Sequence, residues 1–277
     1  MALIADRITP ALGAEITGFD AEAQLETAVV DELHAQLMEH HVLFIRDCDL
    51  SPTDLTSLGA ALGTLGARHH SYPTHPESDD VVILEWQGND RPDAAEWHSD
   101  LTYRDTPPFA SILKAVVVPP VGGDTLWASM FSVYDSLPPG MKDDLAELEA
   151  VHDMGAFRTP AYREGGNEGI LNAFANARTA VHPIVEHHPT TGRPYLNVSE
   201  SFTRFIIGLS APEAGRLLTE LFDRINRPDH HVRLRWKPNT LAIWDNRGTQ
   251  HYGVVDYLPH LRRLHRVAVV DDARQVT

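Results

Sequence analysis

The sequence is poor in cysteine, in basic residues and in long apolar runs, and each shortage excludes a class of protein. Cys48 is the single cysteine, so no internal disulfide can form, and we expect a buried thiol in a reducing compartment. The 23 basic residues face 39 acidic ones, which leaves a formal net charge of -16. Because nothing would offset the repulsion of phosphates, this charge argues against nucleic acid and anionic membranes as partners.

Long apolar segments are missing both at the start of the chain and within it. The opening stretch "MALIADRITPALGAEITGFD" has a charge and a proline before any apolar run of signal-peptide length. No segment approaches the roughly 18 uninterrupted apolar residues that a transmembrane helix requires. We therefore expect a cytoplasmic protein with no membrane partner. We also expect a homo-oligomer.

The chain of 277 residues carries no repeat, low-complexity segment or linker that would mark a domain boundary, so we expect one domain over residues 1–277. Apolar spacing predicts helices within 21–40, 51–63 and 210–227, and a helical region broken by two prolines at 132–153. A polar, glycine-bearing stretch at about 152–178 is interpreted as a lid loop. Runs rich in apolar, β-branched and aromatic residues predict strands, among them 41–47, 81–86, 109–118, 124–129, 240–245 and 263–271.

The stretch "WHSD" at 97–100 places a histidine and an aspartate one residue apart. In an extended strand, His98 and Asp100 would share a face, where they form either two corners of a metal site or a hydrogen-bonded surface pair. The candidate third ligand is His251, which ends the motif "WDNRGTQH". Two histidines and one carboxylate are typical of non-haem Fe(II) oxygenases, whereas a zinc hydrolase would use a tetrahedral site with one open position. The residues alone leave both possibilities open.

Two arginines, Arg262 and Arg266, interrupt the otherwise apolar final strand. A spacing of four keeps both on one face of a strand. Buried guanidiniums are costly unless an anion pairs with them. A dicarboxylate that also chelates iron would pair with one of them. The alternative is that both form ion pairs with the protein's own carboxylates.

Taken together, the motifs "WHSD", "GGDTLWAS", "WDNRGTQH" and "HRV" resemble the taurine dioxygenase family of Fe(II)- and 2-oxoglutarate-dependent oxygenases, from about residue 16 to 270. The resemblance implies a mainly β fold with flanking helices, namely a double-stranded β-helix or jelly roll. It implies Fe(II), 2-oxoglutarate and O2 as the cofactor and co-substrates, with His98, Asp100 and His251 as metal ligands. It further implies that Thr125 and Arg262 hold the far carboxylate of 2-oxoglutarate.

The same resemblance assigns a substrate pocket, although only part of its pattern is present. Arg266 matches the arginine that meets the acidic head group of the substrate, and the other pocket positions are His69 or His70, Tyr72 and Phe202. Ala94 stands where taurine-using members have an asparagine. Trp97, Trp127 and Trp244 are interpreted as core residues, and Asp245 and Asn246 as residues that fix the turn before His251.

The expected reaction is hydroxylation of a small anionic substrate. Taurine or a related sulfonate is the first candidate, with release of sulfite and an aldehyde besides succinate and CO2. The same chemistry on an alkyl sulfate ester or an aryloxyalkanoate is the nearest alternative. A zinc-dependent hydrolase and a non-catalytic barrel that binds a small acid are alternatives of other classes.

Overall fold

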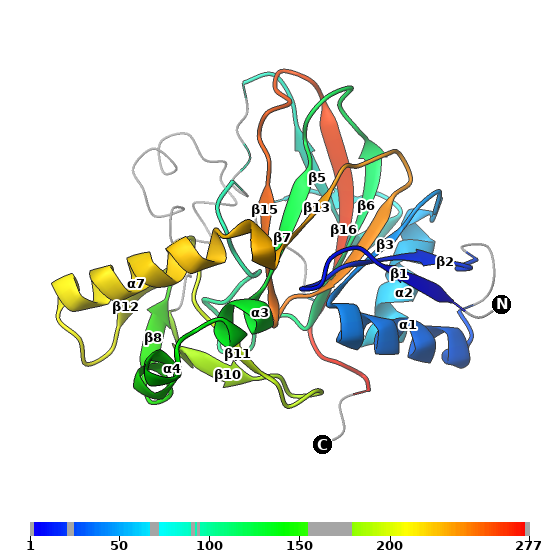
Figure 1. Cartoon of the computed structure of the whole chain (residues 1–277). Coiled ribbons are helices and arrows are strands. Elements are labelled where there is room, and N and C mark those ends of the chain that lie inside the picture. Colours follow the sequence, from blue (N-terminus) through cyan, green and yellow to red (C-terminus); the bar gives the residue numbers. More distant parts are fainter. Residues whose placement is uncertain are drawn as a thin grey trace.

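The computed structural model describes residues 3–20, 25–66, 72–89, 92, 95–154 and 179–274. Strands occupy the centre of the molecule, with α1 and α2 on one side and α3, α4 and α7 on the other (Figure 1). From residue 155 onward, the predicted lid loop lies outside the described residues, as do His69, His70 and Ala94. Among the described helices, none has the length and apolar character that crossing a membrane requires.

The largest sheet has eight strands, and its neighbours are antiparallel except for β2 and β3, which run parallel. Two of its inner strands, Val42–Ile45 and Leu241–Asp245, are buried along their whole length, which matches their apolar sequences. Across the sheet the order is β1 (Ile4–Arg7), β2 (Ala14–Thr17), β3 (Val42–Ile45), β14 (Leu241–Asp245), β6 (Ala110–Val117), β16 (Arg262–Val269), β5 (Ser78–Trp86) and β4 (Thr74–His75).

A smaller sheet of three strands packs against the large one. It consists of β13 (His231–Leu234), β7 (Thr125–Ser129) and β15 (Thr249–Gly253), with β7 in the middle. Trp127 of the small sheet and Trp244 of the large sheet are fully buried in one apolar cluster that both sheets share. Trp97 is buried in a neighbouring cluster, so all three tryptophans are core residues as predicted. The two facing sheets form the predicted jelly roll.

Two helices cover the outer face of the large sheet, α1 (Thr27–His40) and α2 (Pro52–Leu62). The predicted N-cap Ser51 accepts a hydrogen bond from the backbone N–H of Asp54, whose side chain in turn accepts one from the Ser51 backbone. The helix ends at Gly63, as predicted, where a Cβ atom would lie 2.0 Å from the carbonyl oxygen of Asp271. Glycine is therefore required at this close approach to the chain beyond β16. Cys48 is buried under this layer, as predicted.

The remaining elements pack beside the small sheet (Figure 1). Residues 132–153 were predicted to be helical, but their last part forms the strand β8 (Glu149–His152). Alternate side chains of this strand are buried, and it pairs with a neighbouring strand on each side. The helices are α3 (Met130–Asp135), α4 (Pro139–Leu145), α7 (Ala211–Ile225) and the short η2 (Pro228–His230). The strands are β8 (Glu149–His152), β9 (Ala180–Pro183), β10 (Val185–His187), β11 (Pro194–Leu196) and β12 (Thr203–Ile206).

Candidate metal centre

Two segments that are far apart in the sequence, 97–100 and β15, lie side by side at the centre of the molecule. His98 and His251 form an antiparallel bridge, in which the His98 N–H donates to the His251 carbonyl at 3.2 Å and the reverse bond measures 2.8 Å. The Ser99 hydroxyl donates to the Thr249 carbonyl at 2.7 Å. This pairing brings the two imidazole centroids to 4.1 Å from each other.

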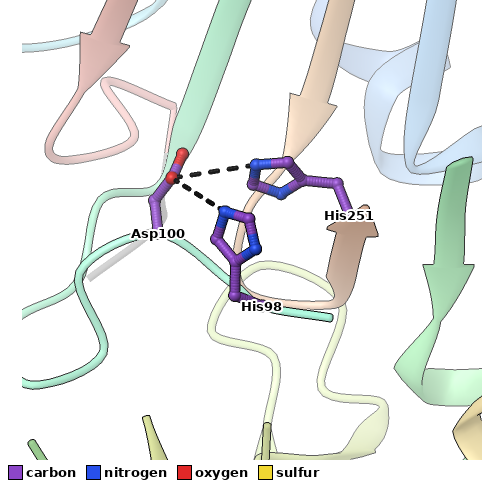
Figure 2. Close-up of side chains that lie close together, drawn as sticks. All are labelled: His98, Asp100 and His251. Carbon is purple, nitrogen blue, oxygen red and sulfur yellow. Dashed lines mark ion pairs between the residues drawn. The ribbon is translucent and has the colours of Figure 1, made fainter. Parts of the chain in front are cut away.

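The three predicted ligands converge on one point (Figure 2). The Nε2 atom of His98 lies 4.0 Å from Oδ1 of Asp100, and Nε2 of His251 lies 3.8 Å from the same oxygen. Ligand atoms bound to one ion at about 2.1 Å on a common octahedral face are about 3 Å apart, so movements of about 1 Å would close the set. The residues therefore fit a divalent metal ion.

Both histidines direct Nε2 at this point, and the contacts of His98 leave its Nε2 without a proton. Nδ1 of His98 is 2.7 Å from the Glu96 carbonyl oxygen, and because a carbonyl can only accept, Nδ1 carries the proton. Burial, together with the neighbouring His98 imidazole, lowers the pKa of His251 to about 3, so this ring is neutral at physiological pH. Neutral imidazoles are the form that binds metal.

The Asp100 carboxylate is ionised and its two oxygens have different surroundings. Burial alone would raise its pKa, but the Arg266 guanidinium and the two imidazoles outweigh that effect and hold the pKa at about 2. Oδ2 accepts a hydrogen bond from the Ser111 hydroxyl at 3.0 Å and forms an ion pair with Nη2 of Arg266 at 2.8 Å. Oδ1 is thereby left as the oxygen that faces both imidazoles. Ser111 was not predicted; the signal that could have pointed to it is its position as the single hydroxyl within the largely apolar sequence of β6.

The contacts of Arg266 differ from the predicted ones in one respect. It was expected to need an anion from outside the protein, whereas it forms an ion pair with Asp100, as the alternative interpretation allowed. Its side chain still lines the central cavity, and its Nε atom is buried with no hydrogen-bond partner among the described residues. Because the side chain lines the cavity, the guanidinium still faces the space that a ligand would fill.

The metal triad opens into a cavity of about 130 Å³ between the two sheets. Most of its wall is apolar, and it includes Tyr72 and Phe202, which were predicted to line the substrate pocket. Phe202 stands edge-on to the His98 ring at 6.1 Å, so an aromatic wall lies beside the metal ligands. The polar groups on the wall include His98, Asp100, Thr125, His251, Arg262 and Arg266.

Arg262 and Thr125 form a second polar group on the cavity wall. Nε of Arg262 donates to the Gly123 carbonyl at 3.0 Å, and Nη2 donates to Oγ1 of Thr125 at 3.2 Å. Oγ1 also accepts from the Trp236 indole at 3.0 Å, so the Thr125 hydroxyl proton is left to donate elsewhere. Burial lowers the pKa of Arg262 to about 10, and the group stays charged at neutral pH. Within the described part of the chain, no carboxylate forms an ion pair with Arg262.

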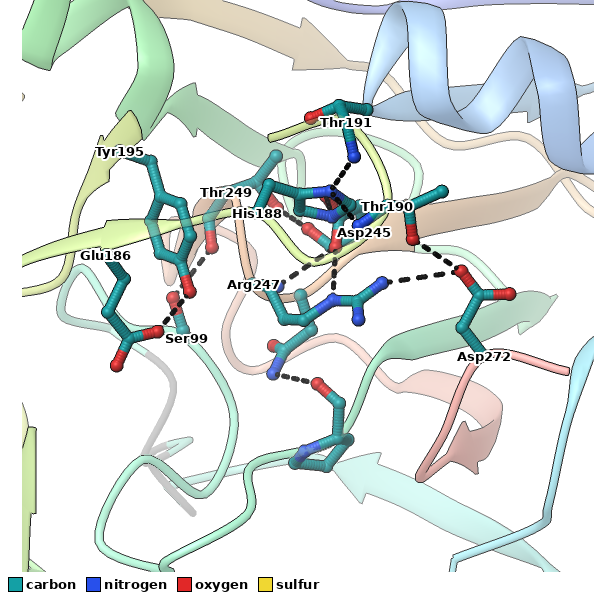
Figure 3. A network of polar contacts seen from close by, with 12 residues as sticks. Ser99, Glu186, His188, Thr190, Thr191, Tyr195, Asp245, Arg247, Thr249 and Asp272 are labelled. Carbon is teal, nitrogen blue, oxygen red and sulfur yellow. Dashed lines mark hydrogen bonds and ion pairs between the residues drawn. The ribbon is translucent and has the colours of Figure 1, made fainter. Parts of the chain in front are cut away.

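Asp245 stabilises the turn before β15, as predicted, through a buried network (Figure 3). Its Oδ2 lies 3.0 Å from Nε2 of His188, and its backbone carbonyl accepts from the Thr249 hydroxyl at 2.6 Å. Nδ1 of His188 accepts from the N–H groups of Thr190 and Thr191, so Nε2 carries the proton and faces the Asp245 carboxylate. Asn246, in contrast, makes its side-chain contacts outside this turn.

Known proteins are similar to this chain in sequence and in fold. Residues 5–268 match the model of the family described as "Taurine catabolism dioxygenase TauD, TfdA family". An alkylsulfatase of Acinetobacter baylyi is 32% identical over 96% of this chain and 84% of its own length. An alpha-ketoglutarate-dependent sulfate ester dioxygenase of Pseudomonas putida is 33% identical, over 94% of this chain and 87% of its own.

A solved structure described as a taurine dioxygenase from Burkholderia xenovorans superposes with a TM-score of 0.84 at 30% identity, covering 98% of this chain and 90% of the other. The family match covers nearly the whole chain, and the zinc hydrolase and the non-catalytic barrel are therefore set aside. The chain belongs to the TauD/TfdA family and is an Fe(II)- and 2-oxoglutarate-dependent dioxygenase, which uses O2.

Proposed function

We propose that this dioxygenase hydroxylates the carbon next to the sulfur-bearing group of a small organosulfur anion, an alkyl sulfate ester or a sulfonate. The observation that carries the proposal is the position of Arg266, a cation on a mostly apolar cavity wall beside the metal ligands. Its bond to Asp100 uses Nη2, and a guanidinium has donors on all three nitrogens. The remaining donors suit the tetrahedral oxygens of a sulfate or sulfonate head group.

Among organosulfur anions, an alkyl sulfate ester fits better than taurine, which was our first candidate from the sequence. Taurine carries an ammonium group, and a buried ammonium needs an anionic or polar partner. Among the described residues of the cavity wall, the metal ligand Asp100 is the one carboxylate, and it is already paired with Arg266. Two relatives at 32% and 33% identity are named for sulfate esters, which supports the same choice.

Each predicted site residue has a role in this proposal. His98, Asp100 and His251 hold the iron, and the bound iron supplies the activation of O2. Arg262 and the Thr125 hydroxyl bind the far carboxylate of 2-oxoglutarate, because a planar fork and a free O–H on the cavity wall match a carboxylate. Arg266 binds the substrate head group; His69 and His70, which the sequence predicts for the same pocket, lie outside the described residues. Tyr72 and Phe202 contact the organic part of the substrate and exclude water.

The overall chemistry balances without any further reactant. One oxygen atom of O2 enters succinate as 2-oxoglutarate loses CO2, and the other becomes the hydroxyl group on the substrate carbon. In a sulfate ester, that carbon then carries both a hydroxyl and the ester oxygen. The hydroxyl proton leaves, the C=O bond of an aldehyde forms, and the C–O bond to sulfate breaks. In a sulfonate the C–S bond breaks instead, and sulfite is released.

The test is a comparison of substrates with the same carbon chain. Hexyl sulfate, hexanesulfonate, hexanoate and the neutral hexanol are supplied with Fe(II), 2-oxoglutarate and O2, with taurine and an aryloxyacetate alongside. Succinate, sulfate and sulfite are quantified. We expect hexyl sulfate to give the highest kcat/KM and one sulfate for each succinate. Faster turnover of hexanol than of any anion would refute the proposal, and fastest turnover of taurine would replace the sulfate ester by that sulfonate.

A further inference from the structure

Asn246 makes three hydrogen bonds to the segment that carries Asp100. It lies in the turn between β14 and β15, and it is fully buried. Its Oδ1 accepts from the backbone N–H of Asp100 at 2.7 Å. Its Nδ2 donates to the backbone carbonyls of Asp100 and Pro108, both at 3.1 Å. The Asn246 carboxamide therefore binds both the backbone N–H and the backbone carbonyl of Asp100.

Only a carboxamide of this length meets these demands. The site needs one acceptor, for the Asp100 N–H, and a donor with two hydrogens, for two carbonyls. An aspartate at this position would set a carboxylate oxygen against two carbonyl oxygens in a buried site. A serine would be too short to reach both sides. The contacts also fix which atom is oxygen and which is nitrogen.

We propose that Asn246 is a positioning residue for the metal ligand Asp100. Both peptide groups of Asp100 are fixed by Asn246, so the direction of the Cα–Cβ bond is fixed, and Oδ1 is aimed at the two imidazoles. The next residue, Leu101, has a φ of 58°, a left-handed conformation that non-glycine residues rarely adopt. The bond from Asn246 to the Asp100 carbonyl holds the chain in this conformation just after the ligand.

The contacts separate this role from simple stabilisation of the turn. The side chain of Asn246 makes no hydrogen bond within its own turn among the described contacts. The turn is held instead by Asp245, which accepts from the Arg247 N–H at 3.1 Å and from the Thr249 hydroxyl through its carbonyl. Because Asn246 precedes His251 on the same segment, one turn positions two of the three ligands.

The test uses Asn246→Asp and Asn246→Ser, with Asn197→Asp as a matched control. The Asn197 side chain donates to Glu186 at 3.0 Å, and among the described hydrogen bonds it makes none to either metal segment. Mn(II) binding to the metal-free proteins is measured by calorimetry at a temperature where all variants are folded. We expect the Kd to rise about 10- to 100-fold in both Asn246 variants, as for other residues that orient a ligand, and to stay unchanged in Asn197→Asp.

The outcomes distinguish this inference from the proposed metal triad on which it rests. A wild-type protein that binds no Mn(II) overturns the triad and the positioning role with it. A wild-type Kd retained in the Asn246 variants overturns the positioning role alone. An equal loss of affinity in Asn197→Asp would assign the effect to general destabilisation and also overturn it.

A measurement on the wild-type protein covers the case in which the Asn246 variants do not fold. The Asp100 amide hydrogen is expected to exchange with solvent only through rare opening, because its acceptor is a buried side chain. Hydrogen exchange followed by NMR reports this amide directly. Fast exchange of the Asp100 amide in the folded protein would overturn the role of Asn246.

Discussion

At the residue scale, contacts from three parts of the chain meet at Asp100. Oδ2 is bound by Ser111 of β6 and by Arg266 of β16, and both backbone groups are bound by Asn246. Of the polar atoms of this residue, Oδ1 is the one directed at the imidazoles. The carboxylate thus joins the metal site to the arginine that we assign to the substrate head group.

Replacing Asp100 with alanine should therefore affect both metal binding and stability. We expect Asp100→Ala to weaken Mn(II) binding by more than about 100-fold, because a direct ligand is lost. The free energy of unfolding should fall by about 3 to 5 kcal/mol, because Arg266 is left as an unpaired buried charge. Calorimetry and denaturant unfolding measure the two effects. Unchanged Mn(II) affinity in a folded variant would show that the triad is misassigned.

Arg262 is the residue whose geometry matters most for 2-oxoglutarate. Its side chain donates at once to Gly123 and Thr125, which holds the planar fork against the cavity. Lysine keeps a charge but cannot make paired hydrogen bonds to a carboxylate. We expect Arg262→Lys to raise the KM for 2-oxoglutarate at least about tenfold, with a smaller change for the organosulfur substrate. A larger change in the substrate KM would exchange the roles of Arg262 and Arg266.

From the sequence, the metal ligands and the two arginines were predicted, because their residue types and spacing form motifs. Few of the residues that hold these side chains in place were predicted. The period of two in "WHSD" placed His98 and Asp100 together, and the spacing of four placed Arg262 and Arg266 on one wall. The contact between Asn246 and Asp100 joins residues 146 apart in the chain. No local pattern encodes such a pairing, because it exists only after β14, β6 and the metal segment have assembled.

At the scale of elements, the segment that follows β16 connects the large sheet to α1 and to the loop between β10 and β11. Asp272 is the centre of this junction. One oxygen lies 2.9 Å from Nε2 of His34, and the other accepts from the Thr190 hydroxyl at 2.9 Å. The same oxygen lies 3.7 Å from the Arg247 guanidinium, so the junction extends to the turn before β15.

The junction should make stability depend on pH in the acid range. Burial raises the pKa of Asp272, but the bond from His34 and the other donors outweigh burial and lower it to about 2. A depressed pKa means that the stabilisation is complete above about pH 4, the unfolded value, and is lost as the pH falls towards 2. We expect Asp272→Asn to reduce the free energy of unfolding by about 2 kcal/mol at pH 7 and by progressively less below pH 4.

Denaturant unfolding of the wild type and Asp272→Asn between pH 7 and pH 3 checks this expectation. The neighbouring Asp271, which binds Thr64 at the surface, provides the control. Asp271→Asn should change the free energy of unfolding by less than about 1 kcal/mol, because water screens exposed charges. A difference between wild type and Asp272→Asn that grows on acidification would contradict the account.

Elements with strong local signals were the most predictable. The capping boxes at Ser51 and Ser210 mark the starts of α2 and α7. The strand β8 was missed, because its four residues follow a helical pattern without a break. Its strand form depends on pairing with β9 and β12, two elements that come later in the chain. Such tertiary pairing overrides local preference.

At the scale of the whole molecule, the two sheets enclose a cavity whose wall carries both the metal ligands and the residues that we assign to 2-oxoglutarate. We propose that the chain is one domain. Mn(II) and 2-oxoglutarate should bind only the folded protein. At concentrations about 100 times their Kd, each stabilises by about 2.7 kcal/mol, which corresponds to a Tm increase of roughly 5 °C for a chain of this size.

Differential scanning calorimetry with Mn(II), with 2-oxoglutarate and with both measures this stabilisation. The increment from 2-oxoglutarate should require Mn(II) in the wild type. Arg262→Lys should keep the increment from Mn(II) and lose most of the increment from 2-oxoglutarate, because the far carboxylate is held by the arginine. Equal increments in Asp100→Ala and the wild type would show that the metal binds elsewhere.

The most direct test of the central claim is the anomalous diffraction of crystals grown with Mn(II) and 2-oxoglutarate without oxygen. The account predicts one strong manganese peak bound by Nε2 of His98, Oδ1 of Asp100 and Nε2 of His251. It also predicts the far carboxylate of 2-oxoglutarate between Arg262 and the Thr125 hydroxyl. A manganese peak that does not involve all three residues, or 2-oxoglutarate bound with its far carboxylate at Arg266, would contradict it.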